Sequence, residues 1–234
     1  IPALIDLQIY GAGDKLLSEF PEADTIEKTY RYCLKGGAAY FQPTIASQSI
    51  DVIYASIDAV KAYKASGGKG CIGLHIEGPW INVGKKGAHD ASVIHAPDME
   101  EVHSILAYGA DAISMITLAP EICTPAIIKT IQDAGIIVSA GHTNASYETA
   151  MQFFNDGIPV ATHLFNAMSS FQHRAPGVGA FARCATRQQR HQPLFSAQVQ
   201  CQRRRYAGQP QWHLLRRPRA QDGHSRQLNL PDGS

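Results

Sequence analysis

Three residues with metal-binding side chains stand at the ends of separate apolar segments: Glu77, His142 and His163. Taken singly, the carboxylate is equally typical of a structural ion pair, and each histidine is more typical of a buried core position. Together, a carboxylate oxygen and two imidazole nitrogens suit a borderline divalent ion such as zinc, and three protein ligands leave room for a water. Because such an ion makes hydroxide available near neutral pH, these residue types predict metal-dependent hydrolysis.

Two further polar residues lie in loops on the same side of the predicted sheet. His89 belongs to the loop that follows Glu77, where it would polarise a substrate carbonyl or bind a substrate hydroxyl. Arg174 follows the segment of His163, and its planar guanidinium matches a phosphate or a carboxylate. For both residues the competing interpretation is an ordinary solvated side chain in a loop.

Short apolar segments alternate with amphipathic segments along most of the chain. The amphipathic segments carry apolar residues at helical spacing, for example Ile53, Ile57 and Val60. Thr124-Pro125 predicts the start of a helix, and Gly135 and Gly157 predict the ends of two helices. Six segments have the length and composition of strands covered on both faces: residues 3–10, 38–45, 71–77, 112–119, 136–142 and 160–165.

This alternation predicts βα units around a parallel sheet. The polar residues collect where strands end, and the catalytic groups of a (β/α)8 barrel lie at the C-terminal ends of its strands, so the predicted fold class is an α/β TIM barrel. Six of the eight βα units are recognisable, which makes the barrel incomplete. A doubly wound sheet is the second candidate, weakened because the sequence has no G-x-G-x-x-G after the first strand and no G-x-x-x-x-G-K-[ST].

The composition changes near residue 180, although the net charge of the whole chain is only +1. Residues 1–180 carry 9 Lys and 2 Arg against 18 acidic residues, a net charge of −7, whereas residues 181–234 carry 10 Arg against 2 acidic residues, a net charge of +8. We therefore divide the chain into a partial barrel, residues 1–179, and an Arg- and Gln-rich tail, residues 180–234. We favour a shifted reading frame as the origin of the tail, because two more βα units are needed there. A disordered tail and a nucleic-acid-binding arm are the alternatives.

Cysteine usage and hydropathy favour a reducing, cytoplasmic setting. The 5 cysteines are widely spaced and form no C-x-x-C, so they indicate neither a disulfide framework nor a cysteine zinc site. The apolar runs are far shorter than a membrane span, and no signal peptide is recognisable. The chain begins at Ile1 inside a predicted strand, which predicts that it is a fragment.

Six short motifs combine the candidate residues in one order along the chain. They are Asp6-Leu-Gln-Ile-Tyr-Gly11, His75-Ile-Glu-Gly-Pro79, Gly87-Ala-His89, Gly141-His-Thr-Asn-Ala145, Thr162-His-Leu-Phe-Asn-Ala-Met168 and His173-Arg-Ala-Pro-Gly177. In order and spacing these motifs resemble the N-acetylglucosamine-6-phosphate deacetylases of the amidohydrolase superfamily. The resemblance covers residues 1 to about 179, and six ordered motifs make it specific.

The resemblance implies which residues form the site. Glu77, His142 and His163 would bind one catalytic divalent ion, with zinc as the expected metal. Many amidohydrolases hold a second metal through H-x-H at the end of the first strand, but this chain has Gln8 and Tyr10 there, so one metal per chain is expected. The implied substrate contacts are Ala88, His89, Asn166, Ala167 and Arg174. Arg174 would contact the phosphate.

The resemblance also implies the reaction and the partners. The reaction is hydrolysis of the N-acetyl amide of N-acetylglucosamine 6-phosphate to glucosamine 6-phosphate and acetate, with the metal and His89 stabilising the developing oxyanion. The expected partner is a small amino-sugar phosphate rather than a nucleic acid or a membrane, and a homodimer is a common assembly of the family.

The family's proton-transfer aspartate, at the end of the eighth strand, has no recognisable counterpart. Neither Asp222 nor Asp232 ends an apolar strand, so no residue is predicted to be the catalytic acid and base. Loss of this group should cost on the order of a hundredfold or more in rate. An amidohydrolase acting on a cyclic amide and an inactive fragment that binds metal or sugar phosphate are the alternatives.

Overall fold

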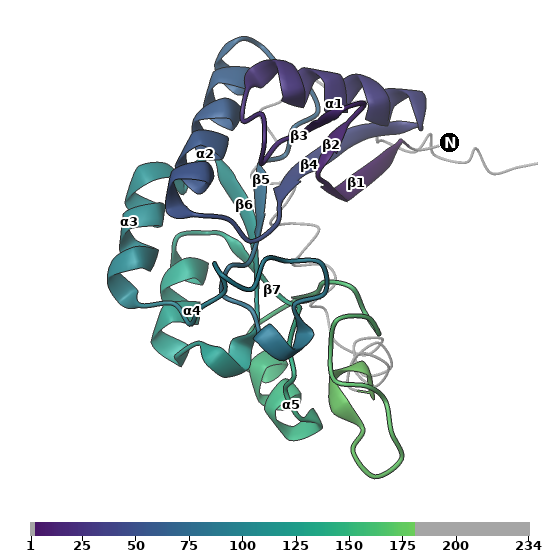
Figure 1. The fold of residues 1–234 in the computed structure, drawn as a ribbon, viewed down its shortest axis with the longest axis vertical. Helices are drawn as coiled ribbons and strands as arrows, with labels where there is room; N and C mark the ends of the chain where they lie inside the picture. Colours follow the sequence, from purple (N-terminus) through teal and green to yellow (C-terminus); the bar gives the residue numbers. More distant parts are fainter. Residues whose placement is uncertain (1–2, 181–234) are drawn as a thin grey trace, which may run out of the picture. The chain divides into compact units, whose positions relative to one another are not determined.

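The computed structural model describes residues 3–180, and its central feature is a parallel sheet of six strands (Figure 1). The strands stand in the order β1-β4-β5-β6-β7-β8, which follows their order along the chain. This order is the one that successive βα units produce. The strands are β1 (Leu4–Ile9), β4 (Ala38–Ile45), β5 (Leu74–Glu77), β6 (Ile113–Leu118), β7 (Ile137–Ala140) and β8 (Val160–Ala161).

Helices join the strands and follow the outer side of the curved sheet (Figure 1). A small hairpin of β2 (Gly11–Ala12) and β3 (Lys15–Leu16) precedes the first helix. Two short 3-10 helices, η1 (Val83–Lys85) and η2 (Pro120–Ile122), follow β5 and β6. The α-helices are α1 (Ala23–Lys35), α2 (Ile50–Ala65), α3 (Met99–Gly109), α4 (Pro125–Asp133) and α5 (Tyr147–Asn155). None of the helices within residues 3–180 is long and apolar enough to cross a membrane.

Residues at the helix ends explain where α4 begins and where α4 and α5 end. Thr124 Oγ1 accepts the backbone N–H of Ile127 at 3.3 Å and satisfies a donor that has no partner inside the helix. Gly135 and Gly157 have φ of 77° and 98°, left-handed values that stop a helix at little cost only for glycine. The helix signals predicted from the sequence are therefore confirmed.

Alternation along the strands separates an apolar outer face from a polar inner face. Ile76, Ile116 and Val138 face the helices and belong to the hydrophobic core. Burying each such side chain fully contributes about 1.5 to 3 kcal/mol. The intervening residues, among them Thr117 and Ser139, point to the inner face, where the chain places its polar groups.

A buried layer of hydroxyl groups and one histidine crosses the inner face. His75 Nε2 lies 2.7 Å from Thr117 Oγ1, and that oxygen lies 2.8 Å from Thr162 Oγ1. Ser139 Oγ continues the chain at 2.7 Å from Thr162. Burial lowers the pKa of His75 to about 4, so the ring is neutral near pH 7. The layer thus satisfies its own polar side-chain atoms.

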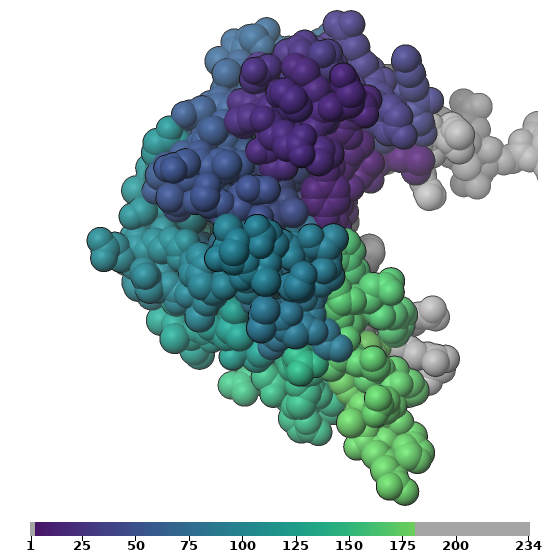
Figure 2. Space-filling view, viewed as in Figure 1, coloured from purple at the N-terminus to yellow at the C-terminus, as the bar shows by residue number. Residues whose placement is uncertain are grey.

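The described sheet is open, as expected for six of eight barrel units. Within residues 3–180, β1 pairs only with β4, and β8 pairs only with β7. Leu4 on β1 is 64% exposed, an unusual value for an apolar residue in a parallel strand. Figure 2 shows the surface hollowed between the N-terminal segment, in purple, and the segment near residue 175, in green. The α/β fold class is confirmed as a partial TIM barrel.

The close packing of α3 on α2 gives a first prediction. Gly109 ends α3, and a Cβ added there would lie 2.3 Å from Ile57 Cγ2. We expect Gly109→Ala to lower the free energy of unfolding in urea by about 1 to 3 kcal/mol, because the core must shift. Gly36→Ala is the control, since the added Cβ would meet Cys33 O at an ordinary 3.4 Å. Equal losses in the two variants would show that the contact with Ile57 is not tight.

Candidate metal centre

Glu77 is the last residue of β5, and its side chain is fully buried on the inner face. A buried carboxylate without partners costs several kcal/mol, so it persists only where donors or cations surround it. The partners come from the C-terminal ends of other strands and from the loop after β5. The site is therefore described by the distances of these partners from the Glu77 carboxylate.

Three histidines approach Glu77. His142 Nε2 lies 3.1 Å from Oε1, and His163 Nε2 lies 2.8 Å from the same oxygen. His89 Nε2 lies 3.6 Å from Oε2. Ligand atoms of Glu77, His89 and His142 all lie within 4.8 Å of one another, a spacing that fits a metal ion. The structure thus brings His142 and His163 to Glu77, but the trio with metal-binding spacing contains His89 and not His163.

Hydrogen bonds on the far side of two rings distinguish the two buried histidines. His142 Nδ1 lies 2.8 Å from the carbonyl oxygen of Lys85, which can only accept, so Nδ1 carries the hydrogen and the neutral ring offers its Nε2 lone pair toward Glu77. The two ring nitrogens of His89 have the opposite roles, because its Nδ1 accepts the backbone N–H of Ser47 at 3.1 Å. Its Nε2 carries the hydrogen. When its ring is neutral, His142 therefore offers a lone pair toward Glu77, whereas His89 offers an N–H.

The backbone at two of these histidines has an unfavourable conformation. His142 and His163 have φ of 49° and 56°, in the left-handed region that non-glycine residues rarely adopt. Each such residue costs about 1 to 3 kcal/mol and persists only where its surroundings hold it, commonly at functional sites. His142 follows β7 and His163 follows β8, so two neighbouring strands end in the same strained turn. This turn directs both imidazoles toward Glu77.

The Glu77 carboxylate stays ionised although it is buried. Burial alone would raise the pKa of the Glu77 carboxyl, but hydrogen bonds from His142, His89 and Tyr10 outweigh burial and hold that pKa far below its usual range. Burial opposes a charged ring at His142, yet its bond to Glu77 raises the pKa of His142. Because Nδ1 donates to the Lys85 carbonyl, the protonated ring makes the bond from Nε2 to Glu77 Oε1 at 3.1 Å, and a bound cation would take the place of that proton.

Gln8 and Tyr10 occupy the end of β1, beside the carboxylate. The Tyr10 hydroxyl donates to Glu77 Oε2, and Gln8 Nε2 donates to the Tyr10 oxygen at 2.7 Å. Gln8 Nε2 also lies 3.5 Å from His163 Nε2. Burial raises the pKa of Tyr10, which keeps the phenol a donor near neutral pH. Among residues 3–180 the cluster at Glu77 is the one group with metal-binding spacing.

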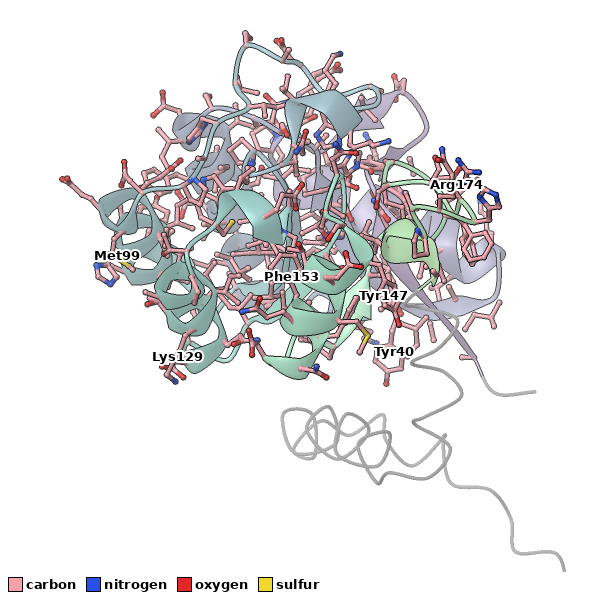
Figure 3. All side chains as sticks on the ribbon, turned by 90° about the horizontal axis from the view of Figure 1, so that it is seen from below. Tyr40, Met99, Lys129, Tyr147, Phe153 and Arg174 are labelled. Carbon is pink, nitrogen blue, oxygen red and sulfur yellow. The ribbon has the colours of Figure 1, made fainter. Side chains whose placement is uncertain are left out.

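The other sequence-predicted site residues do not join the cluster. Ala88 is exposed beside buried His89, and Asn166 is exposed after His163. Ala167 has a left-handed φ of 48°, and its carbonyl accepts the Thr143 N–H at 3.2 Å. Arg174 is exposed at the edge of the molecule in Figure 3. Asp222, Asp232 and nearly all of the predicted tail lie outside the described residues.

Comparison with known proteins identifies the family. A profile of the amidohydrolase family matches residues 1–189 of this chain. The chain belongs to the amidohydrolase family. Because that family is metal-dependent, the group of Glu77, His89 and His142, with His163 beside it, is its candidate metal centre.

Individual amidohydrolases similar to this chain have related names. The chain is 35% identical over 182 residues to an N-acetylgalactosamine-6-phosphate deacetylase of Shewanella sp. (strain ANA-3), covering 77% of this chain and 46% of that protein. It is 36% identical over 167 residues to the N-acetylglucosamine-6-phosphate deacetylase of Haemophilus influenzae, covering 70% of this chain and 43% of that protein. This amidohydrolase chain therefore spans about half the length of the curated relatives it matches.

Solved structures show the same relation. The N-acetylglucosamine-6-phosphate deacetylase from Pasteurella multocida superposes with a TM-score of 0.72 at 36% identity, covering 76% of this chain and 48% of that one. The enzyme of the same name from Thermotoga maritima superposes with a TM-score of 0.68 at 26% identity. The described part of this amidohydrolase has the fold of the corresponding half of those enzymes.

Proposed function

We propose that this chain carries the metal-binding half of a deacetylase that hydrolyses the N-acetyl amide of N-acetylglucosamine 6-phosphate to glucosamine 6-phosphate and acetate. The observation that carries the proposal is the convergence of Glu77, His142 and His163 at the C-terminal ends of three parallel strands. The names of the relatives support the substrate class. Two of those names differ in the configuration of the sugar, so the galactosamine epimer belongs in every assay.

We assign the metal to Glu77, His142 and His163, with zinc as the preferred ion for one carboxylate and two imidazoles. The donor set fits such an ion, since the Lys85 carbonyl holds Nδ1 of His142, Nε2 faces the cluster and Glu77 stays anionic. When bound, a divalent ion of this kind lowers the pKa of a water and polarises a carbonyl. Gln8 and Tyr10 offer neither an imidazole nor a carboxylate at the end of β1, which supports one metal per chain.

The roles of the chain's own residues follow from their hydrogen bonds. His89 directs an N–H into the site and would donate it to the acetyl carbonyl oxygen as negative charge develops there. Tyr10 holds Oε2 of Glu77, which leaves Oε1 on the side of His142 and His163. His163 is 35% exposed and so lies where a substrate reaches the cluster. The acid and base of the reaction stay unassigned.

Acetate release from four compounds tests this function. The zinc-loaded full chain is incubated with N-acetylglucosamine 6-phosphate, its galactosamine epimer, unphosphorylated N-acetylglucosamine and dihydroorotate. Among the four compounds, we expect only the phosphorylated sugars to release acetate. The expected rate is on the order of a hundredfold or more below that of a full-length relative. Hydrolysis of dihydroorotate would favour the cyclic-amide alternative. Binding of zinc and sugar phosphate without acetate release would favour the inactive binding fragment.

Arg174 gives a prediction that does not depend on turnover. We propose that its guanidinium binds the 6-phosphate, together with substrate contacts from Ala88, Asn166 and Ala167. Arg174→Ala should weaken the binding of glucosamine 6-phosphate by about 10- to 100-fold, the worth of a charge-assisted hydrogen bond, and leave glucosamine unaffected. Arg31→Ala is the control, because Arg31 pairs with Glu27 on the surface of α1. If the parent bound glucosamine 6-phosphate and glucosamine with equal affinity, Arg174 would have no role in binding the phosphate.

We also propose a cytoplasmic location. The described cysteines Cys33, Cys71 and Cys123 are free thiols, which supports a reducing compartment. A homodimer stays an expectation from the resemblance, to be measured by light scattering on the full chain.

A further inference from the structure

Glu121 lies outside the metal cluster but connects two segments that enclose His142. It belongs to η2, directly after β6. Its Oε1 accepts Asn82 Nδ2–H at 3.0 Å and the backbone N–H of Asn144 at 2.7 Å. Its Oε2 accepts the Thr143 hydroxyl at 2.5 Å. One carboxylate therefore joins the loop after β5 to the two residues that follow His142.

The loop that Glu121 holds contacts His142 at two places. The backbone N–H of Asn82 donates to the carbonyl oxygen of His142 at 2.9 Å. The Asn82 side chain also accepts the N–H of Gly84 at 2.9 Å and caps η1, whose last residue, Lys85, offers its carbonyl to His142 Nδ1 at 2.8 Å. Both the backbone and the ring of His142 thus depend on the position of Asn82.

The residues after His142 extend this connection toward the second histidine. Thr143 N–H donates to Ala167 O at 3.2 Å, and Thr143 O accepts Ser169 N–H at 3.1 Å. These bonds join Thr143 to the segment that follows His163. Because His142 has a left-handed backbone, its conformation depends on such neighbours rather than on its own preference.

We propose that Glu121 is the positioning residue of the metal ligand His142, fixing through three hydrogen bonds the loop of Asn82 and the backbone at Thr143 and Asn144. The inference rests on the proposed metal site. Glu121 contacts neither the cluster nor a substrate group, so it acts through His142. Its loss releases the Lys85 carbonyl that sets the tautomer of the ring and the turn that aims Nε2 at Glu77.

Zinc affinity of the metal-stripped full chain tests the proposal, measured by competition with a chromogenic chelator. Glu121→Ala should weaken zinc binding by about 10- to 100-fold, as substitutions behind a metal-ligating histidine do. Glu121→Gln should stay close to the parent, because an amide oxygen still accepts from Asn82 and Asn144 while its N–H donates to Thr143. Glu27→Ala is the control, since Glu27 accepts Arg31 Nε–H and the Tyr63 hydroxyl far from the site.

A second variant keeps the test decisive if Glu121→Ala does not fold. Thr143→Val removes one of the three bonds to Glu121, together with the bond that Thr143 Oγ1 accepts from the Ala145 N–H at 3.2 Å, and leaves the carboxylate. It should therefore weaken zinc binding by roughly 2- to 10-fold. Parent-like affinity in Glu121→Ala, or in Thr143→Val where only that variant folds, would overturn the proposal. A loss in Glu121→Gln as large as in Glu121→Ala would overturn it as well, because charge rather than position would then matter.

The ring nitrogens of His142 give a measurement without metal. In the metal-free chain at alkaline pH, ¹⁵N NMR should show the Nδ1–H tautomer in the parent and in Glu121→Gln, and a mixture of tautomers in Glu121→Ala. An unchanged tautomer in Glu121→Ala would contradict the positioning role. If the parent binds no zinc while the tautomer responds to Glu121→Ala, the proposed metal site fails and the link between Glu121 and His142 stands.

Discussion

Glu77→Gln is expected to weaken zinc binding by at least about 100-fold, since substitutions behind a ligand already cost about 10- to 100-fold. Gln keeps the size of the side chain but removes the negative charge toward which three histidines and Tyr10 converge. The neutral amide can also donate an N–H to the lone pair of His142 Nε2, and that hydrogen bond occupies the lone pair that a metal needs. The effect is measured on the metal-stripped full chain by chelator competition.

A matched carboxylate separates this effect from a general loss of structure. Glu101 accepts Trp80 Nε1–H at 3.0 Å and lies 2.9 Å from His95 Nε2, so it also has a histidine partner. It lies on α3, outside the cluster. Glu101→Gln should therefore bind zinc like the parent. Zinc affinity in Glu77→Gln within a few-fold of the parent would rule out Glu77 as a metal ligand.

Removal of the metal should lower the thermal stability of the chain strongly. At a free zinc concentration of 1,000 times Kd, binding stabilises the folded state by about 4 kcal/mol. For a chain of this size that energy raises Tm by about 8 to 16 °C. Calorimetry with zinc and then with excess chelator should show this difference in the parent and a much smaller one in Glu77→Gln. The same Tm with and without chelator would indicate that the folded chain holds no metal.

The elements of this fold that the sequence predicted are those with strong local signals. The strand segments 38–45 and 112–119 are apolar runs of strand length, and β4 and β6 lie within them. The cap at Thr124 and the stops at Gly135 and Gly157 follow from backbone chemistry within a few residues. The hairpin of β2 and β3 was missed, because strands of two residues carry no periodicity to recognise.

The sequence predicts residues that converge on Glu77 but not the groups that hold them, and the role of these residues as metal ligands stays a prediction. Glu77, His142 and His163 stand at strand ends, a position that the chain order reveals. The orientation of His89 depends on Ser47, which lies 42 positions away and carries no signal of its own. The sequence leaves open that His89 is an ordinary solvated loop residue. Its burial in the structure excludes that interpretation.

Two other groups that hold the site residues make contacts between positions far apart in the sequence. Tyr10 reaches Glu77 across 67 positions, and Glu121 reaches Thr143 across 22. Such contacts follow from strand register and loop geometry, which a single sequence does not specify. The sequence did carry one usable hint at the first strand, since Gln8 and Tyr10 replace the imidazoles that a second metal needs.

The number of metal ions per chain tests the central claim most directly. The parent and Glu77→Gln are loaded with zinc, freed of unbound metal by gel filtration, and analysed by elemental analysis against protein concentration. One tightly held zinc per parent chain, absent from Glu77→Gln, is the predicted result. Two tightly held ions per chain, no zinc in the parent, or one zinc in both proteins would contradict a single centre built on Glu77, His142 and His163.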